Sequence, residues 1–456
     1  DLNFKKWIDW FGCIKETIIQ CKNKIKKGQV MKLIRNYLRA DQNNYQGHVD
    51  PRFKDLATHF SRLQDARSDQ GGAALAVYFA GEKVVDIHTG KKTQKELWQD
   101  DTLSVCYSTG KGILATLAHI LVSHRFLDYD QPIADYWPEF AQHGKEKLSL
   151  RHLLSHESGL YDIRNIIAQA SEMSDWQHML KVMELSQPRF EIGSEHAYQA
   201  LTFGWLVGGA IEKATQRPLQ ELMKLYLAEP LELDGAYFGV PEHEIARVAK
   251  PLNYQDPEMR ALKAEQKKTQ VHNKVQKKHN PDLIGKAIEL SGQNPEDFLD
   301  AMVPKGMARF SFFDDATLQT LIPAANGVFT ARSLAKIYAM LAQGGRWNNV
   351  ELIDPVTFKS LSTIQNHGRD RVMPIPMKWR LGYHRVLTLG KRATQGFGHI
   401  GYNGSGAWCD PERQLSFAYT HNFPTGSITG DYRLWGLSQE TLRCADQIIH
   451  GKKGWF

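Results

Sequence analysis

The pattern of apolar and polar residues predicts strands near both ends of the chain and helices between them. Residues 71–90, GGAALAVYFAGEKVVDIHTG, form two β-rich runs around Ala-Gly-Glu-Lys, which predicts an antiparallel hairpin. Residues 399–422, HIGYNGSGAWCDPERQLSFAYTHN, predict a second hairpin around Asp-Pro-Glu-Arg. A helical pattern begins at about residue 51, in PRFKDLATHFSRLQDA. A second helical pattern extends from about Tyr432 to Ile449.

This order of elements predicts an α+β fold with one sheet assembled from both ends of the chain, because alternating βαβ units are absent. We expect one α/β lobe from residues 51–107 and 346–456, and a mainly helical lobe from residues 108–345. Residues 256–282 are highly charged and carry few large apolar side chains. They predict a solvated helix or a mobile excursion, with a lid over a neighbouring cleft as the alternative.

Residues 1–50 form a basic arm ahead of these lobes. Residues 1–40 hold ten Lys or Arg and three acidic residues, so the formal net charge of +7 lies in the arm and the body is neutral. A neutral body argues against nucleic-acid binding. Apolar residues recur in the arm every three or four positions, at Trp7, Phe11, Ile14, Ile18, Cys21 and Ile25. This predicts an amphipathic helix that docks on the body or, alternatively, makes peripheral contact with an anionic membrane through residues 1–40.

The composition bears on whether the chain spans a membrane, where it is located and whether it binds a metal. With 42% apolar and 23% charged residues, the chain is typical of a soluble globular protein, and it has no apolar run of the ~18 residues that span a bilayer. Five scattered cysteines show no zinc-like spacing and favour a reducing, cytoplasmic location. His152 and His156 lack the glutamate of a His-Glu-x-x-His motif, so neither a metal nor another cofactor is expected.

Ser108 and Lys111 stand one helical turn apart at the start of an apolar run, within SVCYSTGKGILATLAHILVSHRFLD, residues 104–128. The same spacing recurs at Ser333 and Lys336, and a chain of this length holds about two such pairs by chance. Spacing alone therefore does not distinguish a nucleophile from a helix cap. A lysine in apolar surroundings can become a neutral base, and the start of a helix favours an oxyanion, so a catalytic Ser108 is chemically sound.

Four motifs in one order carry a resemblance to a known family. They are Ser-Thr-Gly-Lys at 108–111, LRHLLSHESGL at 150–160, the tyrosine of GSEHAYQALTFGWLVGGAIE at 193–212, and FGHIGYNGSG at 397–406. The chain resembles the serine β-lactamase and DD-peptidase superfamily over about residues 52–450, and most closely its class C-like family VIII carboxylesterases. The resemblance implies the β-lactamase/transpeptidase-like fold.

The resemblance implies roles for three side chains. Ser108 would be the acylated nucleophile and Lys111 its hydrogen-bonded base. Tyr198 matches the tyrosine of the Tyr-x-Asn motif and would shuttle protons, although an isolated tyrosine is more often a core aromatic residue. The 150–160 motif is interpreted as structural, shaping the cleft without reacting groups.

The resemblance also places one strand at the cleft wall. His399-Ile400-Gly401 stands where the family has Lys-Thr-Gly, and the backbone N–H groups of Ser108 and Tyr402 would form the oxyanion hole. The alternative for His399 is a strand histidine with no part in catalysis.

Two departures from the family pattern bear on substrate. Ala200 replaces the motif asparagine, which loses an amide able to hold a substrate acylamide, and His399 replaces a permanent cation. Both argue for neutral carboxylic esters rather than β-lactams. We expect these esters to carry short or medium acyl chains. The chain also has no Gly-x-Ser-x-Gly, which disfavours an α/β-hydrolase. The remaining alternatives are a D-amino-acid peptidase or weak β-lactamase, and a non-catalytic sensor or scaffold.

Overall fold

The computed structural model describes most of the chain. The described residues are 37–41, 43–65, 71–260, 294–388, 390, 392–428 and 430–451. Most of the basic arm, residues 1–36, and residues 261–282 of the charged segment lie outside them. The predicted arm helix, its membrane contact and the lid therefore stay predictions.

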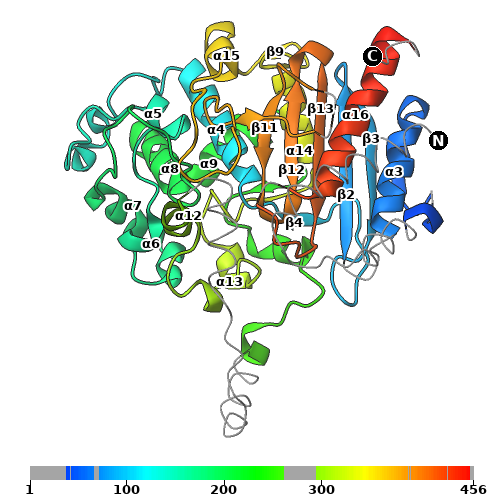
Figure 1. The fold of residues 1–456 in the computed structure, drawn as a ribbon, viewed down its shortest axis with the longest axis horizontal. Coiled ribbons are helices and arrows are strands. Elements are labelled where there is room, and N and C mark those ends of the chain that lie inside the picture. The colour runs from blue at the N-terminus through cyan, green and yellow to red at the C-terminus, as the bar shows by residue number, and fades with distance from the viewer. Residues whose placement is uncertain are drawn as a thin grey trace, which may run out of the picture.

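In the described part of the chain, seven strands form one antiparallel sheet in the order β1-β3-β2-β13-β12-β11-β10 (Figure 1). The strands are β1 (Gln46–Val49), β2 (Gly72–Phe79), β3 (Glu82–Gly90), β10 (His384–Arg385), β11 (Phe397–Ile400), β12 (Gly406–Asp410) and β13 (Leu415–His421). Strand β2 pairs with β13, so the first and last parts of the sheet are joined at its centre. The predicted α+β sheet built from both ends of the chain is confirmed.

Both predicted hairpins are present in this sheet. The turn between β2 and β3 consists of Ala80 and Gly81, both at positive φ, as a type I′ turn requires. Strands β12 and β13 are joined through Pro411–Arg413, a short 3-10 helix, and Gln414. These turns pair the strands so that apolar side chains lie on both faces of the sheet.

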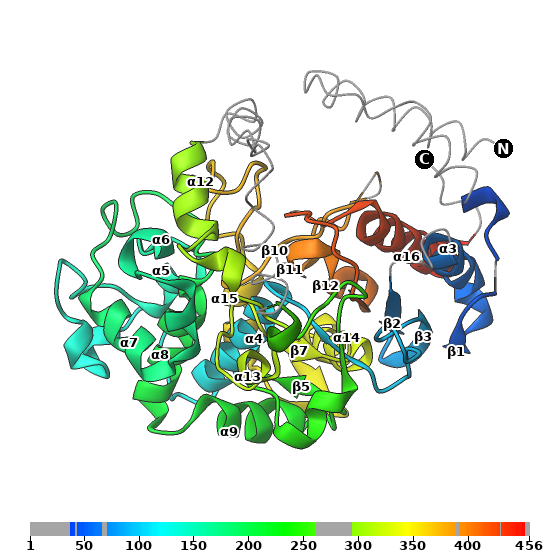
Figure 2. The same ribbon diagram turned by 90° about the horizontal axis from the view of Figure 1, so that it is seen from below.

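Helices cover the two faces of the sheet (Figures 1 and 2). Helices α3 (Lys54–Asp65) and α16 (Tyr432–His450) pack on one face, and their apolar stripes meet side chains of β2, β3 and β13. Helix α14 (Ala331–Ala342) packs on the other face, against β2, β12 and β13. A helix from the segment predicted as a helical lobe thus contributes to the sheet core.

The remaining described helices gather at the β10 and β11 end of the sheet (Figure 1). They are α5 (Leu150–Leu154), α6 (Ile163–Ile166), α7 (Trp176–Leu185), α8 (Thr202–Thr215), α9 (Leu219–Met223), α12 (Pro295–Met302), α13 (Asp315–Leu318) and α15 (Pro355–Ser362). A small sheet has the strand order β5-β7-β4-β6 and consists of β4 (Leu103–Val105), β5 (Ala236–Tyr237), β6 (Val248–Ala249) and β7 (Val328–Phe329). A two-stranded sheet joins β8 (Arg346–Trp347) and β9 (Val350–Glu351).

Helix α4 (Thr109–Ser123) runs through the centre of the molecule, between β11 and α8. It is apolar on nearly all sides, and every residue from Thr109 to Leu121 is buried, as expected of a helix enclosed by other elements. Its N-terminus therefore lies at the junction between the large sheet and the helical region. In the part of the chain that the structure describes, no helix is long and apolar enough to cross a bilayer.

Candidate active site

Ser108 lies at a tight turn between strand β4 and helix α4. The preceding Tyr107 has a φ of 48°, a left-handed conformation that costs energy for a residue with a side chain. The ring of Tyr107 is held edge-on to Phe312 and Tyr402, with centroids 5.7 and 5.6 Å away. The Ser108 hydroxyl makes no capping hydrogen bond to helix α4. This serine begins the helix, but its side chain is not used to cap it.

Lys111 reaches back to Ser108 along the same face of helix α4. Its Nζ lies 2.9 Å from Ser108 Oγ, 2.6 Å from the carbonyl oxygen of Ala200 and 2.9 Å from that of Ala324. The side chain is fully buried, and this burial lowers the pKa of its amine well below the ordinary value. A neutral amine has two N–H bonds for the two carbonyls and one lone pair for the serine proton. The three contacts match this protonation state.

The second Ser-x-x-Lys pair has a different geometry. Ser333 Oγ lies 2.9 Å from Thr330 Oγ1 and donates to Asp234 Oδ1 at 2.9 Å. Lys336 points away, 3.7 Å from Glu232 and over the ring of Trp347. Ser333 thus stabilises the start of helix α14 and has no amine beside its hydroxyl.

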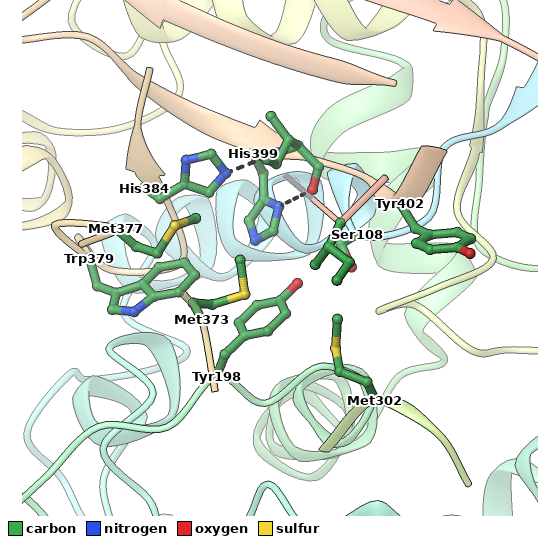
Figure 3. Close-up of a pocket in the computed structure, with 11 residues that line it drawn as sticks. Ser108, Tyr198, Met302, Met373, Met377, Trp379, His384, His399 and Tyr402 are labelled. Carbon is green, nitrogen blue, oxygen red and sulfur yellow. Dashed lines mark hydrogen bonds between the residues drawn. The ribbon is translucent and has the colours of Figure 1, made fainter. Parts of the chain in front are cut away.

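Tyr198 faces the Ser108 hydroxyl from the segment before helix α8 (Figure 3). Its ring stacks on Trp379 with centroids 5.4 Å apart and 8° between planes, and Lys111 Nζ lies 5.0 Å from the ring centre. Burial raises the pKa of the phenol, and its hydrogen bond with Ser108 opposes this only in part. Tyr198 therefore stays protonated at neutral pH and can donate a proton.

His156, from the 150–160 motif, holds the backbone around Tyr198 and packs against its ring. The carbonyl of His156 accepts the backbone N–H of Ala197 at 2.9 Å, and His156 Nδ1 accepts that of Gln199 at 3.3 Å. The His156 ring lies edge-on to Tyr198, 5.1 Å between centroids. These contacts fix the backbone on both sides of the tyrosine.

Strand β11 approaches the start of helix α4 very closely at Gly401. A Cβ atom at this position would lie 2.2 Å from the carbonyl oxygen of Cys106, so no other residue fits without moving the strand. Within the described part of the chain, the backbone N–H groups of Ser108 and Tyr402 have no hydrogen-bond acceptor. The close approach brings these two donors to the same end of helix α4.

His399 lies on β11 beside the Ser108 hydroxyl and is buried (Figure 3). Its Nδ1 donates to the carbonyl oxygen of Ile400 at 2.8 Å, so Nε2 carries the free lone pair, and Nε2 has no partner among the described residues. Burial, with smaller contributions from His384 and Lys111, lowers the pKa of His399 well below the ordinary value. The imidazole is neutral and supplies no permanent cation.

A cavity beside Ser108, here called the Ser108 cavity, is lined by uncharged side chains. It is lined by Ser108, Tyr198, Met302, Met373, Met377, Trp379, His384, His399, Ile400, Tyr402 and Ile428. Burial lowers the pKa of His384 to about 4, so this histidine is also neutral at neutral pH. A substrate group in this cavity meets thioethers, aliphatic groups and rings, and no Asp, Glu, Lys or Arg among its described lining residues.

Sequence reasoning missed the segment that forms one wall of this cavity. Asp370 is buried and accepts hydrogen bonds from the backbone N–H of Tyr198 at 3.2 Å, from those of Val372 and Met373, and from Trp379 Nε1 at 2.8 Å. One carboxyl group thus ties the tyrosine to the Met373–Trp379 wall. The sequence holds no usable signal for this wall, because residues 370–379, DRVMPIPMKW, have neither a helical nor a strand period.

The fold and this site define a serine hydrolase of the β-lactamase/transpeptidase type. Its architecture is an antiparallel sheet with helices at one end and a serine-lysine pair at the start of the central helix. In the described residues, no group of three or more His, Cys, Asp or Glu side chains could hold a metal ion.

The chain belongs to the beta-lactamase family, whose family model matches residues 53–437. It is 33% identical to the esterase/beta-lactamase LipL of Mycobacterium tuberculosis over 384 residues, 82% of each chain. It is also similar to a solved family VIII carboxylesterase, with 27% identity and a TM-score of 0.72 over 88% of this chain and 99% of that one. A penicillin-binding protein homolog from Caulobacter crescentus gives 30% identity and a TM-score of 0.70, over 88% of this chain and 99% of that one.

Proposed function

We propose that this protein hydrolyses neutral carboxylic esters with short or medium acyl chains through an acyl-enzyme on Ser108. The observation that carries the proposal is the 2.9 Å contact between Lys111 Nζ and Ser108 Oγ, with the uncharged Ser108 cavity beside it. Relatives whose names include esterase, such as LipL and EstB of Burkholderia gladioli, support ester chemistry. EstB is 28% identical over 175 residues, 35% of this chain and 44% of its own.

In the proposed acylation step, neutral Lys111 takes the proton of Ser108 as Oγ attacks the ester carbonyl carbon. The carbonyl oxygen becomes an oxyanion and accepts hydrogen bonds from the backbone N–H groups of Ser108 and Tyr402. Tyr198 donates its phenolic proton to the leaving alcohol and regains one from the Lys111 ammonium. The ester C–O bond breaks and the acyl group stays on Ser108.

Deacylation reverses this path with water in place of the alcohol. Water gives a proton to Lys111, which is neutral again after acylation, and its oxygen attacks the acyl carbon. The bond between the acyl carbon and Ser108 Oγ then breaks, and Oγ takes the proton back from the Lys111 ammonium. The free Nε2 lone pair of His399 lies on the wall of the same cavity and can accept a hydrogen bond from this water. In this scheme His399 orients the water through its neutral form and carries no charge.

The alternatives to ester hydrolysis require different groups in the cavity. A penicillin or cephalosporin carries a carboxylate, and Ala200 and the neutral His399 supply neither the amide nor the cation to hold such a substrate. The name of LipL includes β-lactamase, so a chromogenic cephalosporin is assayed in parallel with an ester. A scaffold without activity would turn over neither.

The uncharged cavity predicts a preference between two esters of similar length. We expect kcat/KM for 4-nitrophenyl butyrate to exceed that for 4-nitrophenyl hemisuccinate by at least about tenfold, because the succinyl carboxylate would be desolvated without a counter-ion. Initial rates of nitrophenol release measure this, with each ester normalised to its hydroxide-catalysed rate. Equal values, or a preference for the charged ester, would be incompatible with a neutral acyl site.

The pH dependence of ester hydrolysis follows from the two buried groups. Lys111 must be neutral, so kcat/KM falls as the pH drops through its pKa, which burial has moved well below the usual range for lysine. Tyr198 must be protonated, so the alkaline limb lies above the ordinary tyrosine value. The acid limb of kcat/KM should therefore lie well below the ordinary lysine pKa of about 10.4, and the alkaline limb above about pH 10. Activity that appears only near pH 10 would contradict a Lys111 base whose pKa is lowered by burial.

A further inference from the structure

A second cavity, here called the arginine cavity, lies behind the wall of the Ser108 cavity. It has a volume of about 420 Å³ and is lined by Ile364, Lys378, Arg380, Arg385, Val386, Leu387, Thr388, Gly390, Arg392, Ala393 and Thr394. Four of these side chains are cationic, and none of the described residues that line the cavity is a carboxylate. The lining of the arginine cavity is therefore cationic, whereas that of the Ser108 cavity is uncharged.

Arg380 is the buried member of this group, with only 2% of its surface exposed. Its Nε donates to the carbonyl of Ser362 at 2.8 Å and its Nη2 to that of Thr394 at 3.3 Å. Its Nη1 is buried and has no partner among the described residues. Two neutral carbonyls orient this guanidinium without neutralising it, and a buried uncompensated charge is costly.

Arg385 and Arg392 add to the same unbalanced charge. Arg385 Nε is buried without a hydrogen-bond partner, and Arg392 is exposed. Within the described residues neither forms an ion pair with an acidic side chain, and neither does Lys378. Burial, and then the positive charge of Arg392, lowers the pKa of the Arg385 guanidinium. Like charges held close together around a hollow favour the binding of an anion there.

The backbone between the two cavities explains how they are built. In the irregular segment Met377–Arg380, where Lys378 has a φ of 53°, Met377 and Trp379 line the Ser108 cavity, while Lys378 and Arg380 line the arginine cavity. On strand β10, His384 lines the Ser108 cavity and the next residue, Arg385, lines the arginine cavity. The backbone N–H of Arg385 donates to the carbonyl oxygen of Met377 at 3.0 Å and so joins the two segments. The same two segments thus present an uncharged face to the serine and a cationic face to the other side.

We propose that the arginine cavity binds a phosphate group, held by Arg380, Arg385 and Arg392. Guanidinium groups present planar pairs of N–H donors that match the oxygens of phosphate, and such charge-assisted bonds are stronger than neutral ones. The bound anion supplies acceptors for Arg380 Nη1 and Arg385 Nε, and it removes the repulsion between Arg385 and Arg392. This site is separate from the proposed ester chemistry and does not depend on it.

Isothermal titration calorimetry of the purified protein tests this site. Inorganic phosphate and glycerol 3-phosphate are titrated separately at constant ionic strength, to distinguish a free anion from a phosphate monoester. We expect saturable binding of at least one of them, with a Kd in roughly the millimolar range or tighter. The absence of saturable binding for both probes would overturn the proposal.

Variants then locate the bound anion. We expect Arg385→Gln/Arg392→Gln to weaken binding at least about tenfold. Lys378→Gln/Arg392→Gln changes only exposed side chains, so it keeps the test valid if the first variant fails to fold. Arg125→Gln, which removes an exposed arginine elsewhere, and Ser108→Ala should bind as the wild type does. Unchanged affinity in both cavity variants, or lost affinity in Ser108→Ala, would place the anion elsewhere and contradict the proposal.

Discussion

Ser108→Ala is expected to lower kcat/KM for 4-nitrophenyl butyrate by about 10³-fold or more, because the acyl-enzyme can no longer form. The hydroxyl makes no capping bond to helix α4, so its removal leaves the helix start intact. We therefore expect the far-ultraviolet circular dichroism spectrum and the melting temperature to stay close to those of the wild type. Initial rates with both enzymes, at matched concentrations of folded protein, measure the effect.

The matched control for this variant is Ser333→Ala, in the second Ser-x-x-Lys pair. Ser333 bonds to Thr330 and Asp234, so its loss removes structural hydrogen bonds, each worth about 1 kcal/mol of folding free energy. We expect lower thermal stability but unchanged turnover per folded molecule. Turnover that survives in Ser108→Ala, or falls as far in Ser333→Ala, would disprove the assignment of the nucleophile.

Lys111→Met is expected to lower kcat by about 10²- to 10⁴-fold, because methionine fills much of the same space and cannot accept the serine proton. The substitution also leaves the carbonyls of Ala200 and Ala324 without a donor, so we expect a lower melting temperature. Ester hydrolysis measured well below that melting temperature separates the two effects. The residual rate should lack the acid limb that Lys111 gives the wild type.

Lys336→Met serves as the control for the lysine. Lys336 Nζ lies 3.7 Å from Glu232 and over the ring of Trp347, and not beside the Ser333 hydroxyl. Loss of this amine should therefore leave kcat unchanged. If Lys111→Met kept near wild-type kcat with the wild-type pH profile, another group would have to be the base.

The large sheet could be predicted from the sequence because its hairpins and helices have patterns within short segments. The position of the serine could be predicted because four motifs occur in a fixed order along the chain. The hairpin 71–90 has β-rich runs around a glycine turn, and helix α16 has a clear apolar stripe. The prediction that Ser108 and Lys111 share a helix face also needs only the helical repeat. Helix α4 and the 2.9 Å contact have this geometry.

The wall of the Ser108 cavity could not be predicted in this way. Met373, Met377 and Trp379 lie in a segment without regular structure, and their direction is set by the buried carboxylate of Asp370 and by pairing with β10. Such a wall depends on contacts between residues far apart in the sequence, such as Asp370 with Tyr198. The chance repeat at Ser333 shows the same limit, since only the surrounding side chains distinguish the two serines.

The most direct test of the central claim is to locate the nucleophile by covalent labelling. The protein is incubated with a serine-directed alkyl phosphonate, digested and mapped by mass spectrometry, with Ser108→Ala in parallel. The account predicts one added phosphonyl mass on the peptide that contains Ser108, loss of esterase activity in proportion to labelling, and no label on the variant. Labelling of the peptide that contains Ser333, or equal labelling of Ser108→Ala, would contradict it.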